Sequence, residues 1–258
     1  ETLLLHLIGK NRAWLLAHLD DDFAGCAAIG YEGLLRRRLA GEPIQYIMGE
    51  AEFFGLPFRV TSDVLIPRPE TEHLVERAIA LAERFAGPRI VDIGTGSGAI
   101  AVTLAHILST AQVTAIDLSE AALAVARENA ERNGVLSRIN FIGGDLLEPV
   151  KAQRFDLVVS NPPYVPARDR VTLSVEVRDY EPTLALFGGE DGLEAYRRLI
   201  PAAHTALAPG GCIALEIGYG QSEALGSLLL DAGFAHIEFT PDLQRIARVA
   251  TAQRTPGS

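Results

Sequence analysis

The segment from residue 155 to 164 reads Phe-Asp-Leu-Val-Val-Ser-Asn-Pro-Pro-Tyr. Its first five residues are mostly apolar and too few for a helix, which is typical of a buried strand. Pro162 and Pro163 end that strand, because neither residue can donate a hydrogen bond to a sheet. Asn161 is therefore expected at the carboxyl end of the strand, where open α/β sheets bind their ligands.

Asn161 and the residues after it form a candidate site for a planar nitrogen group. The asparagine side chain both accepts and donates hydrogen bonds, and Tyr164 offers a flat aromatic face. An amino or amide group lying on the tyrosine would donate its hydrogens to Asn161 and to the proline carbonyls. The simpler alternative is a strand that ends in a proline turn with Tyr164 as packing, because short motifs recur by chance.

Strands and helices alternate from residue 89 onward. β-rich apolar runs predict the strands, and apolar residues at helical spacing predict the helices between them. This alternation predicts a parallel, doubly wound sheet. The predicted strands cover residues 89–93, 112–116, 139–142, 155–160, 212–217, 235–239 and 246–250. The predicted helices in this region cover residues 98–108, 120–132, 191–207 and 221–231.

The amino-terminal part of the chain has a different pattern. Residues 1–49 carry apolar positions at helical spacing, broken at Gly9 and Gly41, which predicts short helices that pack on one another. We therefore divide the chain into a helical domain at 1–49, a β-hairpin linker at 50–70 and an α/β domain at 71–258.

Two features of the linker are predicted from its turn residues. Two β-like pieces flank Gly55-Leu56-Pro57, which predicts a hairpin that turns there. Pro67 and Pro69 stiffen the segment that follows. Glu70 or Thr71 is then expected to cap a helix running to about residue 85, and the stiff segment is either a helix entry or a loop presented to a ligand.

Composition narrows the class of protein and of partner. The chain has 258 residues, 48% hydrophobic and 22% charged, which suits soluble globular domains with a real core. A formal net charge of −10 argues against duplex DNA as the main partner. Cys26 and Cys212 have no metal-ligand spacing, and two isolated cysteines indicate a reducing compartment, here the cytoplasm. No apolar run reaches transmembrane length, so no membrane association is expected.

A glycine-rich segment follows the first predicted strand of the α/β domain. It reads Asp92-Ile93-Gly94-Thr95-Gly96-Ser97-Gly98 and leads into a helix. Glycines let the backbone approach a ligand closely, and the free amides at the helix start can hydrogen-bond to it. The spacing lacks the gap before the third glycine that is typical of dinucleotide-binding proteins. Asp92 would attract an ammonium group but repel a pyrophosphate.

Two further acidic residues follow the next two predicted strands. Asp117 lies about twenty residues after the glycine segment, where a carboxylate can bind both hydroxyls of a ribose. Asp145 follows the third strand, where it can accept from an adenine amino group while Leu146 packs on the ring. For each acid the alternative is a helix cap or a loop salt bridge. An ammonium, a ribose and an adenine together describe S-adenosylmethionine.

Here the chain resembles a known family over nearly its whole length. It is similar to the HemK/PrmC family, the methyltransferases that modify the glutamine of the Gly-Gly-Gln motif in peptide chain release factors. The matching segments lie at residues 43–49, 65–72, 92–101, 160–164, 180–182, 188–193 and 215–218. Two departures are Met48, where leucine is expected, and residues 242–248, which lack an expected glycine.

The resemblance implies a class I methyltransferase fold, with a seven-stranded, mostly parallel sheet, and methyl transfer from S-adenosyl-L-methionine to the glutamine amide nitrogen N5 without a metal. It implies that the helical domain helps to dock the release factor. The implied catalytic residues are Asn161, Pro162 and Tyr164, and the implied substrate-binding residues are these three with Pro163. The implied cofactor-binding residues are Gly94, Thr95, Gly96, Ser97, Gly98, Asp117, Asp145, Leu146 and Asn161.

Other functions remain open from the residues alone. An adenine-N6 methyltransferase of nucleic acids would use the same pocket for a flipped adenine, although the acidic charge argues against it. A cofactor-binding protein without catalysis would have no need of an intact segment from Asn161 to Tyr164. A nicotinamide dehydrogenase would need a different glycine spacing.

Overall fold

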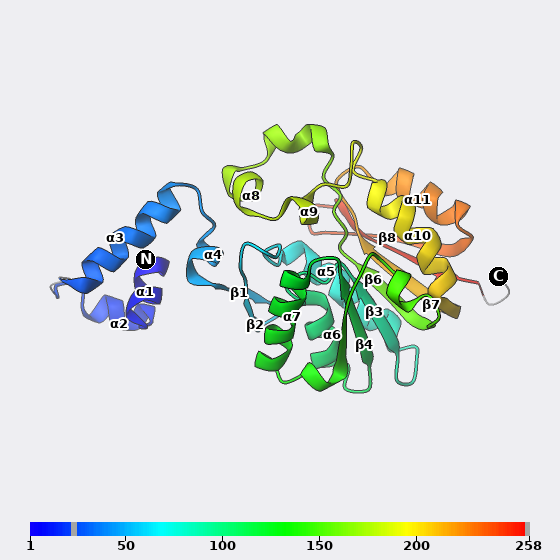
Figure 1. Ribbon diagram of the computed structural model, residues 1–258, viewed down its shortest axis with the longest axis horizontal. Coiled ribbons are helices and arrows are strands. Elements are labelled where there is room, and N and C mark those ends of the chain that lie inside the picture. The colour runs from blue at the N-terminus through cyan, green and yellow to red at the C-terminus, as the bar shows by residue number, and fades with distance from the viewer. Residues whose placement is uncertain (22–24, 256–258) are drawn as a thin grey trace.

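The computed structural model describes residues 1–21 and 25–255 of the chain. A group of helices and a hairpin precede a larger α/β region (Figure 1). The α-helices are α1 (Thr2–Ile8), α2 (Arg12–Ala17), α3 (Cys26–Leu39), α4 (Ile44–Met48), α5 (Pro69–Ala82), α6 (Ala99–Ile107), α7 (Glu120–Arg132), α8 (Val175–Tyr180), α9 (Thr183–Leu186), α10 (Glu194–Ala206) and α11 (Ser222–Asp231). The strands are β1 (Glu50–Phe53), β2 (Leu56–Arg59), β3 (Arg89–Ile93), β4 (Gln112–Asp117), β5 (Ile139–Gly143), β6 (Phe155–Ser160), β7 (Leu207–Glu216), β8 (Phe234–Pro241) and β9 (Ala247–Arg254).

The large sheet has seven strands in the order β5-β4-β3-β6-β7-β9-β8. The first five of these strands run parallel to their neighbours, and β9 is antiparallel to both β7 and β8. The predicted fold is therefore confirmed, and each predicted strand has a counterpart. The largest difference in bounds is at β7, which begins at Leu207 rather than at residue 212.

Helices cover both faces of this sheet, which explains the continuous apolar runs of the central strands. Ile90 and Leu157 point to one face and join a buried cluster with residues of α5 and α6. Val91 and Val158 point to the other face and join a second cluster with residues of α10 and α11. Neighbouring residues of a strand point to opposite faces, so a strand buried on both faces is apolar at most of its positions.

The predicted hairpin is present, but the prediction of its turn was wrong. The turn residues are Phe54 and Gly55, with φ angles of 53° and 73°, and Pro57 lies within β2. Two residues with positive φ make the tight turn that matches the twist of a hairpin. In an antiparallel pair of strands, hydrogen-bonded and non-hydrogen-bonded residue pairs alternate. Val60 donates to the Gly49 carbonyl, so the pair Glu52–Pro57, three steps along the hairpin, is a non-hydrogen-bonded one. The proline is therefore tolerated inside the strand.

This hairpin packs into the core of the α/β region. Phe53 and Phe58 are fully buried and belong to the same cluster as residues of α5 and α6. Asn129 of α7 accepts from the Arg59 N–H at 2.6 Å and donates to the Arg59 carbonyl at 2.9 Å. Figure 1 shows α1–α3 at one end of the molecule, joined to this region through α4 and the hairpin.

The turn between β8 and β9 lacks the glycine that the family resemblance led us to expect. Arg245 occupies the left-handed region there, with a φ angle of 63°. The Asp242 side chain supports the turn, because Oδ1 accepts the N–H groups of Gln244 and Ile246 at 2.8 and 3.0 Å. Its Oδ2 accepts from Arg248 Nε at 2.9 Å. Asp242 therefore holds the turn in a conformation that costs an arginine free energy.

Arg245→Gly is expected to raise the free energy of unfolding by up to about 1 kcal/mol, because glycine removes the left-handed penalty of the arginine. Urea denaturation would measure the change. Leu243→Gly is the matched control, since Leu243 is 98% exposed in the same turn and has no positive φ angle. This control is expected to show no gain. A loss of stability in both variants would contradict the idea that residue 245 is strained.

Candidate active site

A cavity opens where the order of the parallel strands reverses. The chain runs from β3 outward to β4 and β5 and then returns to place β6 on the other side of β3. Ile93 and Ser160 pair at the carboxyl ends of these strands, and Ser160 Oγ donates to the Ile93 carbonyl at 2.7 Å. Open α/β sheets bind ligands at this reversal. The cavity has a volume of about 570 Å³, within the range typical of small-ligand sites.

Most of the predicted site residues line this cavity. Gly98 and Tyr164 do not. The predicted residues that line it are Gly94, Thr95, Gly96, Ser97, Asp117, Asp145, Leu146, Asn161, Pro162 and Pro163. Gly98 lies at the start of α6, where a Cβ atom would come within 3.1 Å of the Ala126 side chain, so its role in the fold is close packing of α6 against α7. The structure thus brings together segments from the ends of β3, β4, β5 and β6.

The glycine segment is held open by backbone hydrogen bonds. Gly94 and Gly96 have φ angles of 71° and 55°, which residues with side chains rarely adopt. The N–H groups of Gly94 and Thr95 both donate to the Ile116 carbonyl, at 2.8 and 3.0 Å. Asn129 Nδ2 donates to the Ser97 carbonyl at 2.8 Å, so α7 also fixes the segment. A ligand in the cavity can therefore approach this backbone closely.

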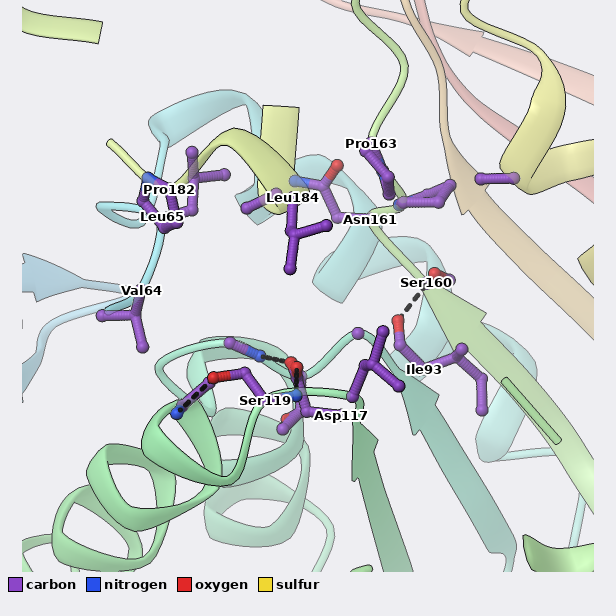
Figure 2. Close-up of a pocket in the computed structure, with 18 of the residues that line it drawn as sticks. Val64, Leu65, Ile93, Asp117, Ser119, Ser160, Asn161, Pro163, Pro182 and Leu184 are labelled. Carbon is purple, nitrogen blue, oxygen red and sulfur yellow. Dashed lines mark hydrogen bonds between the residues drawn. The ribbon is translucent and has the colours of Figure 1, made fainter. Parts of the chain in front are cut away.

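Asp117 is oriented by one backbone N–H on each of its carboxylate oxygens. Oδ2 accepts from Gly96 at 2.8 Å and Oδ1 from Ser119 at 2.9 Å (Figure 2). Each carboxylate oxygen can accept a second hydrogen bond. The residue lines the cavity. The carboxylate is therefore prepared to accept from two neighbouring hydroxyls, as the ribose prediction requires.

Asp92 is a buried carboxyl with one oxygen left without a partner. Its Oδ2 accepts from the Thr95 hydroxyl at 2.7 Å, whereas Oδ1 has no hydrogen-bond partner among the described residues. Burial raises the pKa of Asp92 to about 7, with a smaller contribution from the charge of Asp117, while the Thr95 hydroxyl and the backbone N–H of Ala101 act in the opposite direction. Asp92 is fully buried and does not line the cavity, so the predicted attraction between its carboxylate and an ammonium group stays a prediction.

The raised pKa of Asp92 makes stability depend on pH. Unfolded, the group loses its proton near pH 4; folded, it does so near pH 7. Between these values the folded state holds the extra proton, so the free energy of unfolding falls as pH rises through this interval. Asp92→Asn is expected to show a smaller fall between pH 5 and pH 8, measured by thermal denaturation without cofactor. Equal slopes in the variant and the parent chain would contradict this.

Asp145 and Arg198 lie together in the lining of the cavity, where they form an ion pair. Leu146 lies beside them with a φ angle of 51°, and its side chain packs against the second buried cluster. This ion pair is the loop salt bridge that the sequence left open as the alternative for Asp145. Binding of an adenine amino group by Asp145 stays a prediction. The carboxylate keeps acceptor capacity for an amino group besides its arginine partner.

Asn161 is anchored through its amide nitrogen. Nδ2 donates to Thr71 Oγ1 at 3.1 Å. The prediction that Glu70 or Thr71 caps α5 was wrong, because the helix begins at Pro69 with Arg68 at the N-cap position. Proline is favoured at the first helical position, and this places Thr71 in the first turn with its hydroxyl directed to Asn161 and Glu216.

Tyr164 is placed differently from the prediction. Its ring packs against the second buried cluster, and its hydroxyl donates to Glu216 Oε1 at 3.1 Å. The side chain therefore offers no face to the cavity in this conformation. Apolar packing against α10 and α11 and the hydrogen bond to Glu216 hold the ring toward the core. The ring therefore lies away from the position in which it would stack on a substrate amide.

A segment missed by sequence reasoning covers the opposite side of the cavity. Pro182 and Leu184, around α9, face Asp117 across it (Figure 2). Glu181 is buried and accepts from Arg68 at 2.5 Å, which ties this segment to the entry of α5. The matching segments at 65–72 and 180–182 were the available signal. The paired residues Arg68 and Glu181 are 113 positions apart in the sequence, so their contact is apparent only in the folded structure.

The described residues contain neither a candidate metal site nor a candidate membrane-spanning helix. Within residues 1–21 and 25–255, no group of three or more histidine, cysteine, aspartate or glutamate side chains is arranged to hold a metal ion. In the same part of the chain, no helix combines the length and apolar character needed to cross a bilayer.

The sheet topology and the cavity define a class I methyltransferase, the class that uses S-adenosylmethionine. A family model described as the methyltransferase small domain matches residues 71–177. The crystal structure of a methyltransferase from Pyrococcus furiosus is similar in fold, with a TM-score of 0.59 and 20% identity. That similarity covers 87% of this chain and 99% of the other.

Curated relatives identify the family within this class. A release factor glutamine methyltransferase of Geobacter sulfurreducens is 45% identical over 96% of this chain and 86% of that protein. Another, of Bordetella pertussis, is 46% identical over 95% of this chain and 90% of that protein. A family model described as the PrmC N-terminal domain matches residues 1–49. The chain belongs to the release factor glutamine methyltransferase family, as the resemblance in its sequence indicated.

Proposed function

We propose that the chain methylates the side-chain amide nitrogen of the glutamine in the Gly-Gly-Gln motif of a peptide chain release factor. The main support is the position of Asn161, which lines the cavity with its nitrogen held by Thr71 and its amide oxygen without a partner among the described residues. Membership of the family supports the choice of substrate. Translation termination takes place in the cytoplasm, so we expect the reaction there.

The proposed cofactor site follows from the residues around the cavity. The acceptors on Asp117 and Asp145 line the cavity and fit a ligand rich in N–H and O–H donors. We assign the ribose and adenine ends of S-adenosylmethionine to these two residues in that order. Asp92 lies outside the cavity lining, so its proposed attraction of the ammonium end would act through the glycine segment rather than by direct contact. When bound, the cofactor supplies an electrophilic methyl group. The glycine segment would lie along its methionine end.

The chemistry of the amide explains the residues at the end of β6. An amide nitrogen is a poor nucleophile, because its lone pair is delocalised into the carbonyl. Asn161 Oδ1 and the Pro162 carbonyl are proposed to accept the two N–H groups of the glutamine. Two acceptors on its N–H groups would orient the nitrogen and favour positive charge on it as it is alkylated. Pro163 would help to wall the site.

The helical domain is proposed to contribute to docking of the release factor. It contacts α8, which directly precedes the segment that covers the cavity, because Arg38 pairs with Glu176 and Tyr180 donates to the Ala40 carbonyl at 3.0 Å. A protein bound on the helices would therefore lie beside the entrance to the site. This placement suits a loop of a protein substrate better than an isolated small molecule.

The test is incubation of the purified chain with methyl-labelled S-adenosylmethionine and one of three substrates. These are a release factor, its Gly-Gly-Gln variant with alanine in place of the glutamine, and a DNA duplex. Label on the intact factor alone is the expected result. Label on the DNA would instead establish the adenine-N6 activity, and label on the alanine variant would place the reaction at another residue.

A further inference from the structure

Three buried or half-buried side chains form a continuous chain of hydrogen bonds that ends at the cavity. Asn161 Nδ2 donates to Thr71 Oγ1 at 3.1 Å, and Thr71 Oγ1 donates to Glu216 Oε2 at 2.6 Å. The residues come from the end of β6, the first turn of α5 and the end of β7. Thr71 and Glu216 are 4% and 2% exposed, so the bond between them is shielded from bulk water.

The direction of these hydrogen bonds determines whether the oxygen or the nitrogen of the Asn161 amide faces the cavity. A hydroxyl has a single proton, and Thr71 gives it to the carboxylate of Glu216. The threonine oxygen then has only lone pairs to offer, so Asn161 must turn its NH2 group toward it. A flipped amide would place two acceptors against each other. The Asn161 oxygen, which accepts from none of the described residues, is left for a ligand.

Glu216 is itself held so that it can act as an acceptor. Its second oxygen, Oε1, accepts from the Tyr164 hydroxyl at 3.1 Å, and its backbone carbonyl accepts from the Tyr196 hydroxyl at 2.7 Å. Burial and, to a smaller extent, the charge of Glu70 raise the pKa of Glu216, while the two hydroxyl bonds and the charge of Arg248 act in the opposite direction. Tyr164, which turns away from the cavity, thus has a place in the same network.

We propose that Thr71 and Glu216 are positioning residues for methyl transfer, which hold the Asn161 amide with its oxygen toward the substrate nitrogen. The inference rests on the proposed function for the role of Asn161, although the orientation itself is a property of the free protein. Neither residue touches the reacting atoms. Their effect is to remove the alternative amide orientation, in which an N–H group would meet the N–H groups of the substrate.

Thr71→Val tests the inference, because valine keeps the shape of threonine and lacks the hydroxyl. The kcat for a release factor is expected to fall roughly tenfold, as for the loss of one hydrogen bond, with cofactor affinity by calorimetry unchanged. Thr71→Ser keeps the hydroxyl and is expected to retain most of the activity. Thr103→Val is the matched control, since this buried threonine donates within its own helix to Ala99 at 2.7 Å.

A second measurement reads the orientation without catalysis. The side-chain NH2 resonances of Asn161, identified by their absence in Asn161→Ala, are expected to shift in Thr71→Val and to stay in place in Thr103→Val. Unchanged resonances in Thr71→Val would overturn the inference. So would an unchanged kcat, or a Thr71→Ser variant as impaired as Thr71→Val. If the parent chain methylates no release factor, the proposed function fails, and the resonances alone decide on the orientation.

Discussion

Asn161→Ala is expected to lower kcat for methylation of a release factor by about 10²–10³-fold, the usual cost of removing one preorganised polar contact to the reacting group. The amide oxygen is the side-chain acceptor that the cavity offers next to the Pro162 carbonyl. Without it the glutamine nitrogen keeps one of its two acceptors and samples orientations that do not face the methyl group. Methyl transfer from labelled cofactor under single-turnover conditions would measure the loss.

The effect should be confined to the chemical step. Cofactor affinity is expected to stay within a few-fold of the parent chain, because the segments at Gly94–Gly98 and Asp117 are untouched. Asn140→Ala is a matched control, since this asparagine is exposed on β5 at the edge of the sheet. A variant at Asn161 that kept most of its kcat would show that the nitrogen is positioned by other groups, and would remove the main support for the proposed site.

The large sheet was predictable because strands buried on both faces appear in the sequence as short, mostly apolar runs. Central strands such as residues 155–160 lie between two layers of helices and are therefore apolar almost throughout. The hairpin turn was mispredicted because proline was read as a turn residue. At Pro57 the strand pairing has no ladder bond to lose, and that depends on register, which sequence alone does not reveal.

The site was predictable where it follows strand ends and unpredictable where it depends on distant pairs. The glycine segment, Asp117 and Asn161 each follow a strand, so topology alone brings them to one edge. Thr71 and Glu216 meet across 145 positions of the chain. No local pattern distinguishes such a threonine from a helix cap. Glu216 also accepts from the Tyr164 hydroxyl, 52 positions away, which helps to turn that ring toward the core rather than into the cavity.

Gly188→Ala is expected to lower stability strongly, because the added methyl group would meet backbone. A Cβ atom at residue 188 would press on the carbonyl oxygen of Pro163 and lie 2.8 Å from that of Gly192. Backbone cannot rotate away as a side chain can, so the loop after Asn161 must shift. We expect the free energy of unfolding to fall by about 2–3 kcal/mol, as for other overpacked positions, measured by urea denaturation.

Activity of the same variant tells whether the shift reaches the site. Displacing the segment from Asn161 to Pro163 by about 1 Å would cost about 10²-fold in kcat, whereas a shift absorbed by Gly192 would leave kcat intact. Gly226→Ala is the matched control, since a Cβ there meets Phe239 at an ordinary 3.7 Å inside α11. It is expected to gain about 0.5–1 kcal/mol from helix propensity. If both variants gained stability, the close backbone packing around Gly188 would carry no cost, and the glycine would be explained by neither fold nor site.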